Sequence, residues 1–93
     1  MVDLPSTRGA MTMEQIARTP KQLGAAIRRR RRRTGLTQTL LGEQTQLRQA
    51  TISALENGEP GTQLRTLLDV MAALGLEIVI RERSSGRDIE DVF

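Results

Sequence analysis

The 93-residue sequence contains neither cysteine nor histidine. The absence of cysteine excludes disulfides and thiolate metal sites. Without either residue type the chain lacks the usual general bases, nucleophiles and transition-metal ligands, so the sequence predicts a protein that is not an enzyme and uses no metal or cofactor. Tryptophan and tyrosine are also missing, and Phe93 is the only aromatic residue. The core must therefore consist of Leu, Ile, Val, Met and Ala, which suits packed helices.

Long hydrophobic runs are missing as well. The longest, residues 78–80, is far too short to span a bilayer, and no apolar segment near the start resembles a signal peptide. We therefore expect no membrane association and a cytoplasmic protein. A chain of 93 residues forms one domain at most, with a small core.

Acidic residues are scarce in one region and basic residues in another. The formal charge is only +3, but residues 21–33 contain Lys21 and six consecutive arginines, Arg28 to Arg33, and no acidic residue. From Ser84 onward the balance is reversed, with three acidic residues and one arginine. This asymmetry predicts a polyanion as the partner of the basic part and a different partner for the tail.

The first predicted helix begins at Thr19-Pro20. Thr19 is a good N-cap, Pro20 fits the first helical position, and Gln22 completes a capping box. The helix continues through an apolar stripe and the arginine run, and ends at residues 34–35; the stripe consists of Leu23, Ala26 and Ile27. The preceding residues 1–18 show no sustained period and are expected to form a flexible arm.

The arginine run permits two interpretations. Six consecutive helical positions point in every direction around the axis, so they cannot all face one DNA backbone. In the structural interpretation most are solvated, and Arg30 and Arg31 lay their alkyl stems along the core and project their charged ends outward. In the functional interpretation two or three of them approach phosphates without reading sequence, and Arg28 and Arg29 are the candidates.

Residues 37–58, TQTLLGEQTQLRQATISALENG, have the outline of two short helices joined by a tight turn. Thr37 is the expected N-cap of the first helix, and Leu40 and Leu41 its expected buried face. The second begins near Arg48 and is expected to stop at residues 57–58, since Asn and Gly both tolerate the left-handed conformation. This outline predicts a helix-turn-helix, which places its second helix in the DNA major groove.

The second helix has one apolar and one polar or small side. Ile52 and Leu55, with Leu47 before them, are expected to face the core. The opposite side then carries the candidate base-facing residues, which are Arg48, Gln49, Ala50 and Ser53. Glutamine can bond adenine in a bidentate manner, arginine suits guanine, and an alanine methyl can contact thymine. The alternative is an ordinary solvated face, because these residue types occur on any helix.

Two further elements follow the turn at residues 59–61. A helix is predicted over residues 62–73, with an apolar stripe of Leu64, Leu67, Leu68, Met71 and Leu74. Residues 76–83 alternate, with Leu76, Ile78 and Ile80 on one face and Val79 on the other, which predicts a β-strand. The chain offers no second strand, so the unpaired backbone predicts a homodimer in which two copies pair these strands, or pairing with a different protein.

The tail, residues 84–93, is polar and is expected to be flexible. Its last two residues, Val92 and Phe93, are flanked by acids, and they are a candidate short docking motif for a partner because aromatic anchors dominate interface energetics.

The motif resembles the Xre/Cro-type helix-turn-helix family over residues 19–75. The matching pattern is LGxxIRxxR from residue 23, GLTQ from residue 35 and ATISxLENG from residue 50. Together with the Leu-rich helix and the predicted strand, it is most similar to HipB-type antitoxins. The resemblance implies a mainly α, four- to five-helix, lambda-repressor-like domain and a homodimer with paired C-terminal strands. It also implies binding of double-stranded DNA, as a palindromic operator in the dimer's own promoter, and of a HipA-like kinase toxin.

By position, the resemblance assigns residue roles. It implies base contacts from Arg48, Gln49, Ala50 and Ser53, and phosphate contacts at the start of the first helix of the motif and around the second, from Thr37, Gln38, Thr51 and Asn57. Arg31 and Glu56 match a pair that ties the first helix to the recognition helix. Two departures affect the expected packing and dimerisation: Arg29 and Arg30 replace apolar positions, and Arg81 and Arg83 stand where the family's strand is apolar.

The leading hypothesis is an autoregulating repressor that acts as the antitoxin of a toxin–antitoxin module in a bacterial cytoplasm, associated with the nucleoid through DNA. One alternative is a stand-alone Xre-type regulator without a toxin. Another is an interaction adaptor whose motif no longer reads DNA.

Overall fold

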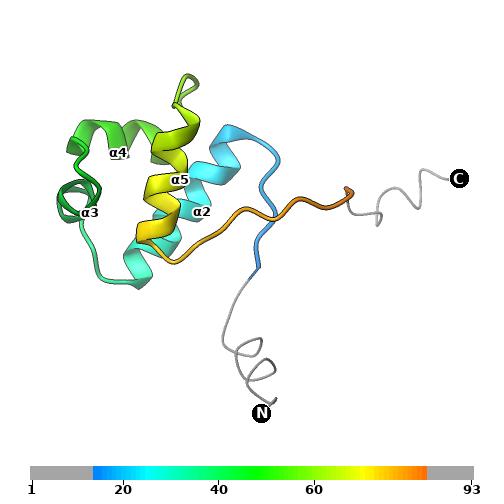
Figure 1. Cartoon of the computed structure of the whole chain (residues 1–93), viewed down its shortest axis with the longest axis horizontal. Coiled ribbons are helices and arrows are strands. Elements are labelled where there is room, and N and C mark those ends of the chain that lie inside the picture. The colour runs from blue at the N-terminus through cyan, green and yellow to red at the C-terminus, as the bar shows by residue number, and fades with distance from the viewer. Residues whose placement is uncertain (1–13, 84–93) are drawn as a thin grey trace, which may run out of the picture.

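Four helices succeed one another in the computed structural model, which describes residues 14–83 (Figure 1). They are α2 (Pro20–Arg33), α3 (Gln38–Thr45), α4 (Gln49–Glu56) and α5 (Leu64–Ala73). Helix α3 packs on both α4 and α5, and α2 packs on α4. The prediction of a mainly helical domain is confirmed, and α3 and α4 occupy the positions predicted for the two helices of the motif.

The start of α2 is fixed by local hydrogen bonds. The Thr19 hydroxyl accepts a bond from the Gln22 backbone N–H at 3.0 Å, as predicted for an N-cap. The Gln22 side-chain oxygen accepts a bond from the backbone N–H of Arg18 at 2.6 Å, one residue earlier than in a standard capping box. Pro20 occupies the first turn, where its missing N–H has no intrahelical partner to lose.

Helix α4 ends at a left-handed glycine. The backbone φ of Gly58 is 75°, and the Glu59 N–H reaches back to the Ala54 carbonyl at 3.0 Å. The helix stops at residues 57–58 as predicted; Asn57 is its C-cap with a φ of −86°, and Gly58 is the residue that adopts the left-handed conformation. A Cβ on Gly58 would also lie 2.6 Å from the Cα of Lys21. This glycine therefore both stops α4 and lets the start of α2 approach it.

The core is aliphatic, as the composition predicts, and joins all four helices. Its buried apolar residues are Ile27, Leu41, Ile52, Leu55, Val70, Met71 and Leu74. Residues Leu23, Leu36, Leu47, Leu67 and Leu76 are partly buried against this cluster. The prediction that Leu40 lies on the buried face of α3 is wrong, since it is 45% exposed. Leu64 and Leu68, which belong to the apolar stripe of α5, are 66% and 45% exposed. The buried side of α5 contains Val70 and Met71. Only part of the apolar side of this helix is therefore covered by its neighbours.

Helices α2 and α4 cross at Gly24. A Cβ on this residue would lie 2.5 Å from the carbonyl oxygens of both Leu55 and Glu56. Because these neighbours are backbone atoms, any side chain here would push the two helices apart. Gly24 therefore sets the distance at which α2 side chains can reach the end of α4.

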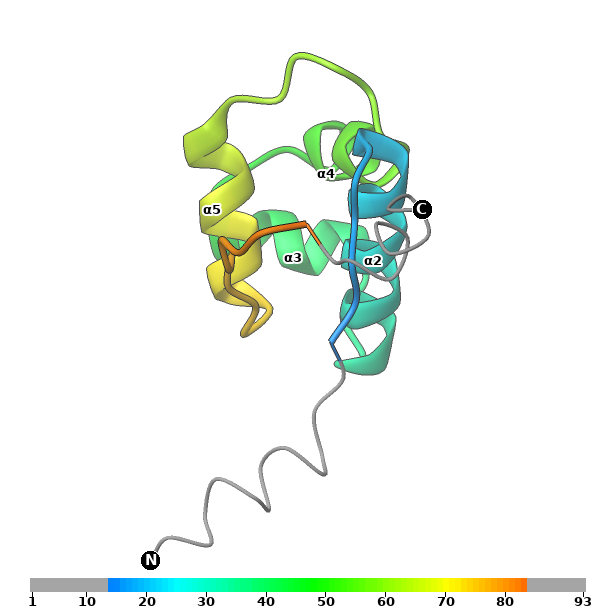
Figure 2. The ribbon, with the colours of Figure 1, turned by 90° about the vertical axis from the view of Figure 1, so that its right-hand side faces the viewer.

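Residues 76–83 leave α5 and pass beside residues 14–18 (Figures 1 and 2). An ion pair of 3.9 Å joins Arg81 to Glu14. Within residues 14–83 no strand is assigned, so the predicted strand is not confirmed in a single chain. Leu76 is half-buried, whereas Ile78, Val79 and Ile80 are 48%, 67% and 93% exposed. Residues 1–13 of the predicted arm, and the tail with Val92 and Phe93, lie outside the described residues.

Candidate nucleic-acid interface

A buried ion pair joins α2 to the end of α4. The Glu56 side chain is 0% exposed and that of Arg31 9%. The guanidinium of Arg31 donates two hydrogen bonds to the carboxylate, at 2.6 Å from Nε and 2.9 Å from Nη2. Its Nη1 donates a third bond, of 2.9 Å, to the Leu36 carbonyl. The pairing implied by the family resemblance is present, whereas the expectation that Arg31 projects its charged end outward is wrong.

The charge state of Glu56 follows from these bonds. Burial by itself raises the pKa of this carboxyl, because it disfavours the charged form. Hydrogen bonds from Arg31, Gln38 and Arg28, with the charge of Arg31, outweigh burial, so the pKa of Glu56 lies below its ordinary value. The same bond raises the pKa of Arg31. Glu56 is thus an ionised, buried acceptor at neutral pH.

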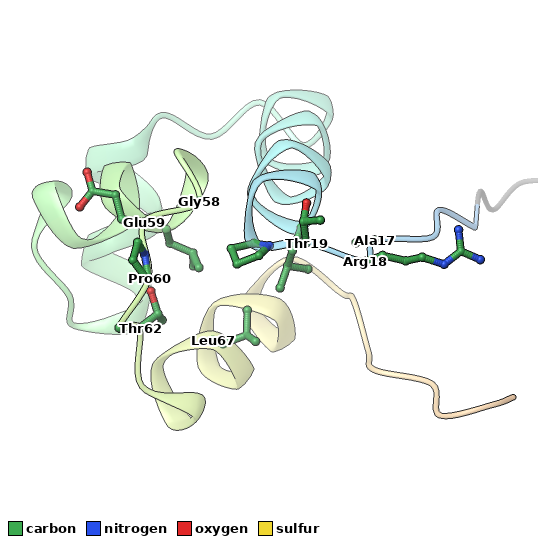
Figure 3. Close-up of a pocket in the computed structure, with 12 residues that line it drawn as sticks. Ala17, Arg18, Thr19, Gly58, Glu59, Pro60, Thr62 and Leu67 are labelled. Atoms are coloured by element: carbon green, nitrogen blue, oxygen red, sulfur yellow. The ribbon is translucent and has the colours of Figure 1, made fainter. Parts of the chain in front are cut away.

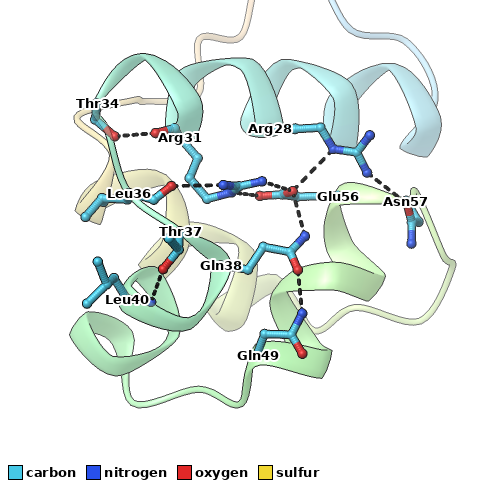
Figure 4. Close-up of polar contacts among 10 residues, drawn as sticks. All are labelled: Arg28, Arg31, Thr34, Leu36, Thr37, Gln38, Leu40, Gln49, Glu56 and Asn57. Carbon is cyan, nitrogen blue, oxygen red and sulfur yellow. Dashed lines mark hydrogen bonds and ion pairs between the residues drawn. The ribbon is translucent and has the colours of Figure 1, made fainter.

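Two glutamines extend this cluster toward the surface (Figure 4). Gln38, the first residue of α3, donates an amide bond of 3.0 Å from Nε2 to the Glu56 carboxylate. Its Oε1 accepts a bond from Nε2 of Gln49, the first residue of α4. Gln38 is half-buried and Gln49 is exposed. We call Glu56, Gln38 and Gln49 the amide relay, because the three side chains connect the buried ion pair to the exposed start of α4.

Three further arginines of the run, Arg28, Arg29 and Arg30, contact different partners. Arg28 donates a bond of 3.0 Å to the Asn57 side-chain oxygen and lies 3.4 Å from the Glu56 carboxylate. Arg29 donates a bond of 2.7 Å to Gln15, on the segment before α2. Arg30 donates a bond of 2.8 Å from Nε to the Leu74 carbonyl at the end of α5. Much of the run therefore ties α2 to its neighbours.

The candidate base-facing residues are grouped along one side of α4. Arg48 is its N-cap, with an extended backbone (φ −76°, ψ 151°), and its side chain makes no capping hydrogen bond. Like Gln49 and Ala50, it is exposed. Ser53 is half-buried. A shallow hollow of about 410 Å³ separates this side of α4 from the loop at residues 59–63. Arg48, Ala50 and Thr51 line the hollow, while Gln49 lies outside it within the amide relay.

The candidate phosphate-contacting residues of α3 and α4 lie near the ends of these helices, whereas Arg28 and Arg29 lie within α2. The Thr37 hydroxyl oxygen accepts a bond from the Leu40 N–H at 3.0 Å, which confirms it as the N-cap of α3. Asn57 is the C-cap of α4 and is exposed, and Thr51 in its first turn is half-buried. The structure thus brings Gln38, Asn57 and Arg28 together around Glu56, but places Arg29 beside the N-terminal segment.

A second hollow of about 360 Å³ lies between the start of α2, the loop after α4 and α5 (Figure 3). Apolar side chains including Leu23, Leu55 and Leu67 line it, and it shares no residue with the amide relay. Within residues 14–83 no group of three or more acidic side chains could hold a metal ion, and none of the described helices is long and apolar enough to cross a membrane.

Sequence reasoning missed the link between Glu56 and Gln38. Glu56 was predicted only as the partner of Arg31, and Gln38 only as a phosphate contact. A signal was available in the spacing of seven between Gln49 and Glu56, because residues two turns apart share one side of a helix. The third member, Gln38, comes from another helix, and its contact distance depends on how α3 and α4 pack.

Comparisons with known proteins agree with this geometry. The family model described as a helix-turn-helix domain matches residues 22–83. A HipB variant in complex with an O2 20-mer is 30% identical, with a TM-score of 0.72 over 77% of this chain and 100% of the HipB chain. A HipA–HipB–O2–O3 complex matches at 31% identity and a TM-score of 0.70, over 76% of this chain and 100% of that chain.

A HipB–O4 20-mer complex gives 31% identity and a TM-score of 0.71, with the same 76% and 100% coverage. No curated protein sequence matches the chain. The family match spans more than half of the sequence, and the solved relatives are covered over their whole resolved length. The chain therefore belongs to the Xre-type helix-turn-helix family, and its described fold is HipB-like.

Proposed function

We propose that this protein is a sequence-specific transcriptional repressor that places α4 in the major groove of its operator. The amide relay carries the proposal, because it holds Gln49 at the exposed start of α4 with hydrogen-bonding capacity left over. Arg48, Ala50 and Ser53 lie on the same helix and supply a guanidinium, a methyl group and a hydroxyl for the neighbouring base edges. The similar HipB structures are complexes with O2 and O4 20-mers, which supports the same use of this surface.

Phosphate contacts are proposed on both flanks of α4. Thr37 and Gln38 lie at the start of α3, and Thr51 and Asn57 lie at the two ends of α4. The second amide hydrogen of Gln38 remains for a phosphate oxygen while the first bonds Glu56. Arg28 and Arg29 contribute positive charge from α2. These contacts position the protein on DNA and do not distinguish one base from another.

A homodimer is proposed through residues 76–83. Within residues 14–83 no backbone hydrogen bond involves residues 77–83, and three consecutive apolar residues of this segment are exposed. Unpaired backbone and exposed Ile78, Val79 and Ile80 favour pairing with the same segment of a second copy, with Leu76 anchoring each segment to its own core. Two copies related by a two-fold axis would present two α4 helices to a palindromic operator.

The finer proposal is that the dimer is the antitoxin of a toxin–antitoxin module in a bacterial cytoplasm. It would repress its own operon and bind a HipA-like kinase. The HipA–HipB–O2–O3 complex among the similar structures supports this partner. Val92 and Phe93, which lie outside the described residues, are proposed to contribute an aromatic anchor to that interface.

The experiment has three readouts on the purified full chain. Light scattering should give a dimer, and an Ile78→Lys/Ile80→Lys variant should be monomeric while the control Glu77→Lys stays dimeric. The wild-type dimer should shift a fragment of its own promoter, with affinity that falls steeply as salt rises. A kinase-like protein encoded beside this chain should co-purify with it.

The outcomes separate the hypotheses. Binding of the promoter without a kinase partner would identify a stand-alone regulator. Co-purification with a kinase-like protein without binding to any DNA would identify an interaction adaptor and overturn the proposed reading of DNA.

A further inference from the structure

The arginine run of α2 has two sides. Arg28 and Arg31 point toward α4, where both contact the Glu56 carboxylate (Figure 4). Three other arginines of the run are exposed, namely Arg29, Arg32 and Arg33. Residues three and four positions apart share one side of a helix, so these three guanidinium groups lie together on the side of α2 that is not packed on α4. We call this set the outer arginine face.

The outer arginine face favours an anion beside it. Like charges three or four positions apart on a helix repel one another, and residues 21–33 contain no acidic residue that would offset them. The hydrogen bond from Arg29 goes to the neutral side chain of Gln15. A negatively charged group next to the three guanidinium groups would therefore relieve their repulsion.

Residues 76–83 bring the chain to this side of α2. They pass beside residues 14–18 (Figures 1 and 2), and Arg81 forms an ion pair of 3.9 Å with Glu14. The next residue, Gln15, accepts the bond of 2.7 Å from Arg29. The chain therefore continues into residues 84–93 from a point close to the outer arginine face.

Residues 84–93 carry the complementary charge. They lie outside the described residues, and their sequence holds three acidic residues, Asp88, Glu90 and Asp91, against one arginine. Asp88 follows residue 83 by five positions and Asp91 by eight, so an extended chain carries them up to about 17 and 27 Å from that residue. The outer arginine face is only about 6 Å long, because a helix rises about 1.5 Å per residue. The carboxylates are thus within reach of all three guanidinium groups.

We propose that the acidic segment 84–93 lies against the outer arginine face of the same chain and competes with DNA phosphates for it. Exposed ion pairs are individually weak, so the segment screens the arginines without blocking them. Its effect falls on attraction to any DNA sequence, because phosphate contacts carry no sequence information. The docking itself does not depend on the proposed function, and only its consequence for DNA binding rests on that function.

The docking is tested without DNA. The chain contains no cysteine, so Val92→Cys gives a single attachment site for a nitroxide spin label on the full chain. Paramagnetic broadening of backbone amide signals in NMR should be strong at residues 29–33 and weak at residues 65–69 of α5. It should decline as salt rises, because salt screens exposed charges. Equal broadening of the two sets of signals, or none at residues 29–33, would overturn the inference.

Two controls identify the occupant and the force that holds it. Asp88→Asn/Glu90→Gln/Asp91→Asn, in the same labelled chain, keeps the length and the apolar residues and should abolish the broadening at residues 29–33. Persistence of the broadening would show that charge does not hold the segment, and would overturn the inference. In a mixture of spin-labelled and isotope-labelled chains, broadening as strong as within one chain would assign the face to a second copy, which also contradicts the proposal.

The consequence for DNA is measured as affinity for random double-stranded DNA. At low salt the neutralised chain Asp88→Asn/Glu90→Gln/Asp91→Asn should bind about fivefold more tightly than the wild type, the order expected for one or two exposed ion pairs. In an Arg32→Gln/Arg33→Gln background the same neutralisation should change affinity by less than about twofold, because the two sets of charges are coupled. Equal effects in both backgrounds would reflect net charge alone and overturn the competition. Absence of any DNA binding would overturn the proposed function, while the spin-label measurement would still decide the docking.

Discussion

The arginine run of α2 and the glutamine pair at the starts of α3 and α4, Gln38 and Gln49, differ in charge and in proposed use. The run holds six positive charges, yet Arg28, Arg30 and Arg31 contact Glu56, Asn57 and the Leu74 carbonyl. The glutamine pair carries no charge, yet Gln49 keeps unused hydrogen-bonding groups at the exposed start of α4. The arginines of α2 mainly hold this helix to the rest of the fold. The uncharged glutamine at the start of α4 is the better candidate for reading bases.

The difference shows that charge density and base-reading capacity are separate properties of a surface. Positive charge attracts any DNA sequence, since every nucleotide carries a phosphate. Discrimination needs donors and acceptors that are held at defined positions, and in this fold the buried Glu56 carboxylate accepts a hydrogen bond from Gln38 of the amide relay. Variants of the two regions should therefore fail in different ways.

The largest expected effect is the loss of the buried ion pair. Arg31→Met leaves the Glu56 carboxylate buried without its main partner, and should lower the free energy of unfolding by about 3–5 kcal/mol. Urea denaturation at neutral pH measures this. The control Arg32→Met, at an exposed position of the same run, should change stability by less than about 0.5 kcal/mol. Equal effects of the two variants would contradict a structural role for Arg31.

A smaller effect is expected at the crossing of α2 and α4. Gly24→Ala places a methyl group 2.5 Å from two backbone oxygens, so it should cost about 1–3 kcal/mol by overpacking. The control Ala25→Gly, one residue along α2, should cost only the helix propensity difference of about 1 kcal/mol. An unchanged or higher stability of Gly24→Ala would contradict the conclusion that the contact of Gly24 with the α4 backbone sets the distance between α2 and α4.

Acid should act on the same ion pair. The pKa of Glu56 lies below its ordinary value of 4.5, so in the interval between the two values the unfolded chain binds more protons than the folded one. The stabilisation from Glu56 is therefore complete above pH 4.5 and is lost as pH falls through the lowered pKa. The stability difference between the wild type and Glu56→Gln should shrink over that acidic range, and a difference independent of pH there would contradict an ionised Glu56.

The smallest expected effect concerns phosphate affinity. Arg29→Ala should make the dependence of log affinity on log salt concentration shallower by about 0.9 per protomer, because one phosphate contact is lost. Fluorescence anisotropy over a salt series measures this slope on promoter and random DNA. Arg65→Ala, which removes an exposed arginine of α5, is the control and should leave the slope unchanged. An unchanged slope for Arg29→Ala would remove this arginine from the DNA interface.

Features determined by neighbouring residues could be predicted from the sequence. The Thr19 and Thr37 caps and the stop at Gly58 depend on a few adjacent residues, and all three are present. The resemblance to the family also identified the Arg31–Glu56 pair. Leu40 is exposed against the prediction, because periodicity identifies an apolar side of a helix but does not show how much of that side a neighbouring helix covers.

The rest depends on contacts distant in sequence. Gln38 lies 18 positions from Glu56 and 11 from Gln49, and these bonds require the actual packing of α3 on α4. The burial of the Glu56 carboxylate likewise follows from this packing and from no local pattern in the sequence. The predicted strand at residues 76–83 needs a second copy to pair with, so a single chain neither contains it nor tests the homodimer.

The central claim is that neutral amides on α4 read sequence while arginines of α2 supply general affinity. The most direct measurement is the dissociation constant of Gln49→Ala and Arg29→Ala on the operator from the protein's own promoter and on random DNA, at one salt concentration. The account predicts that Gln49→Ala loses about tenfold or more on the operator and little on random DNA, whereas Arg29→Ala loses similar factors on both. An equal loss on both DNAs for Gln49→Ala, or an operator-specific loss for Arg29→Ala, would contradict it.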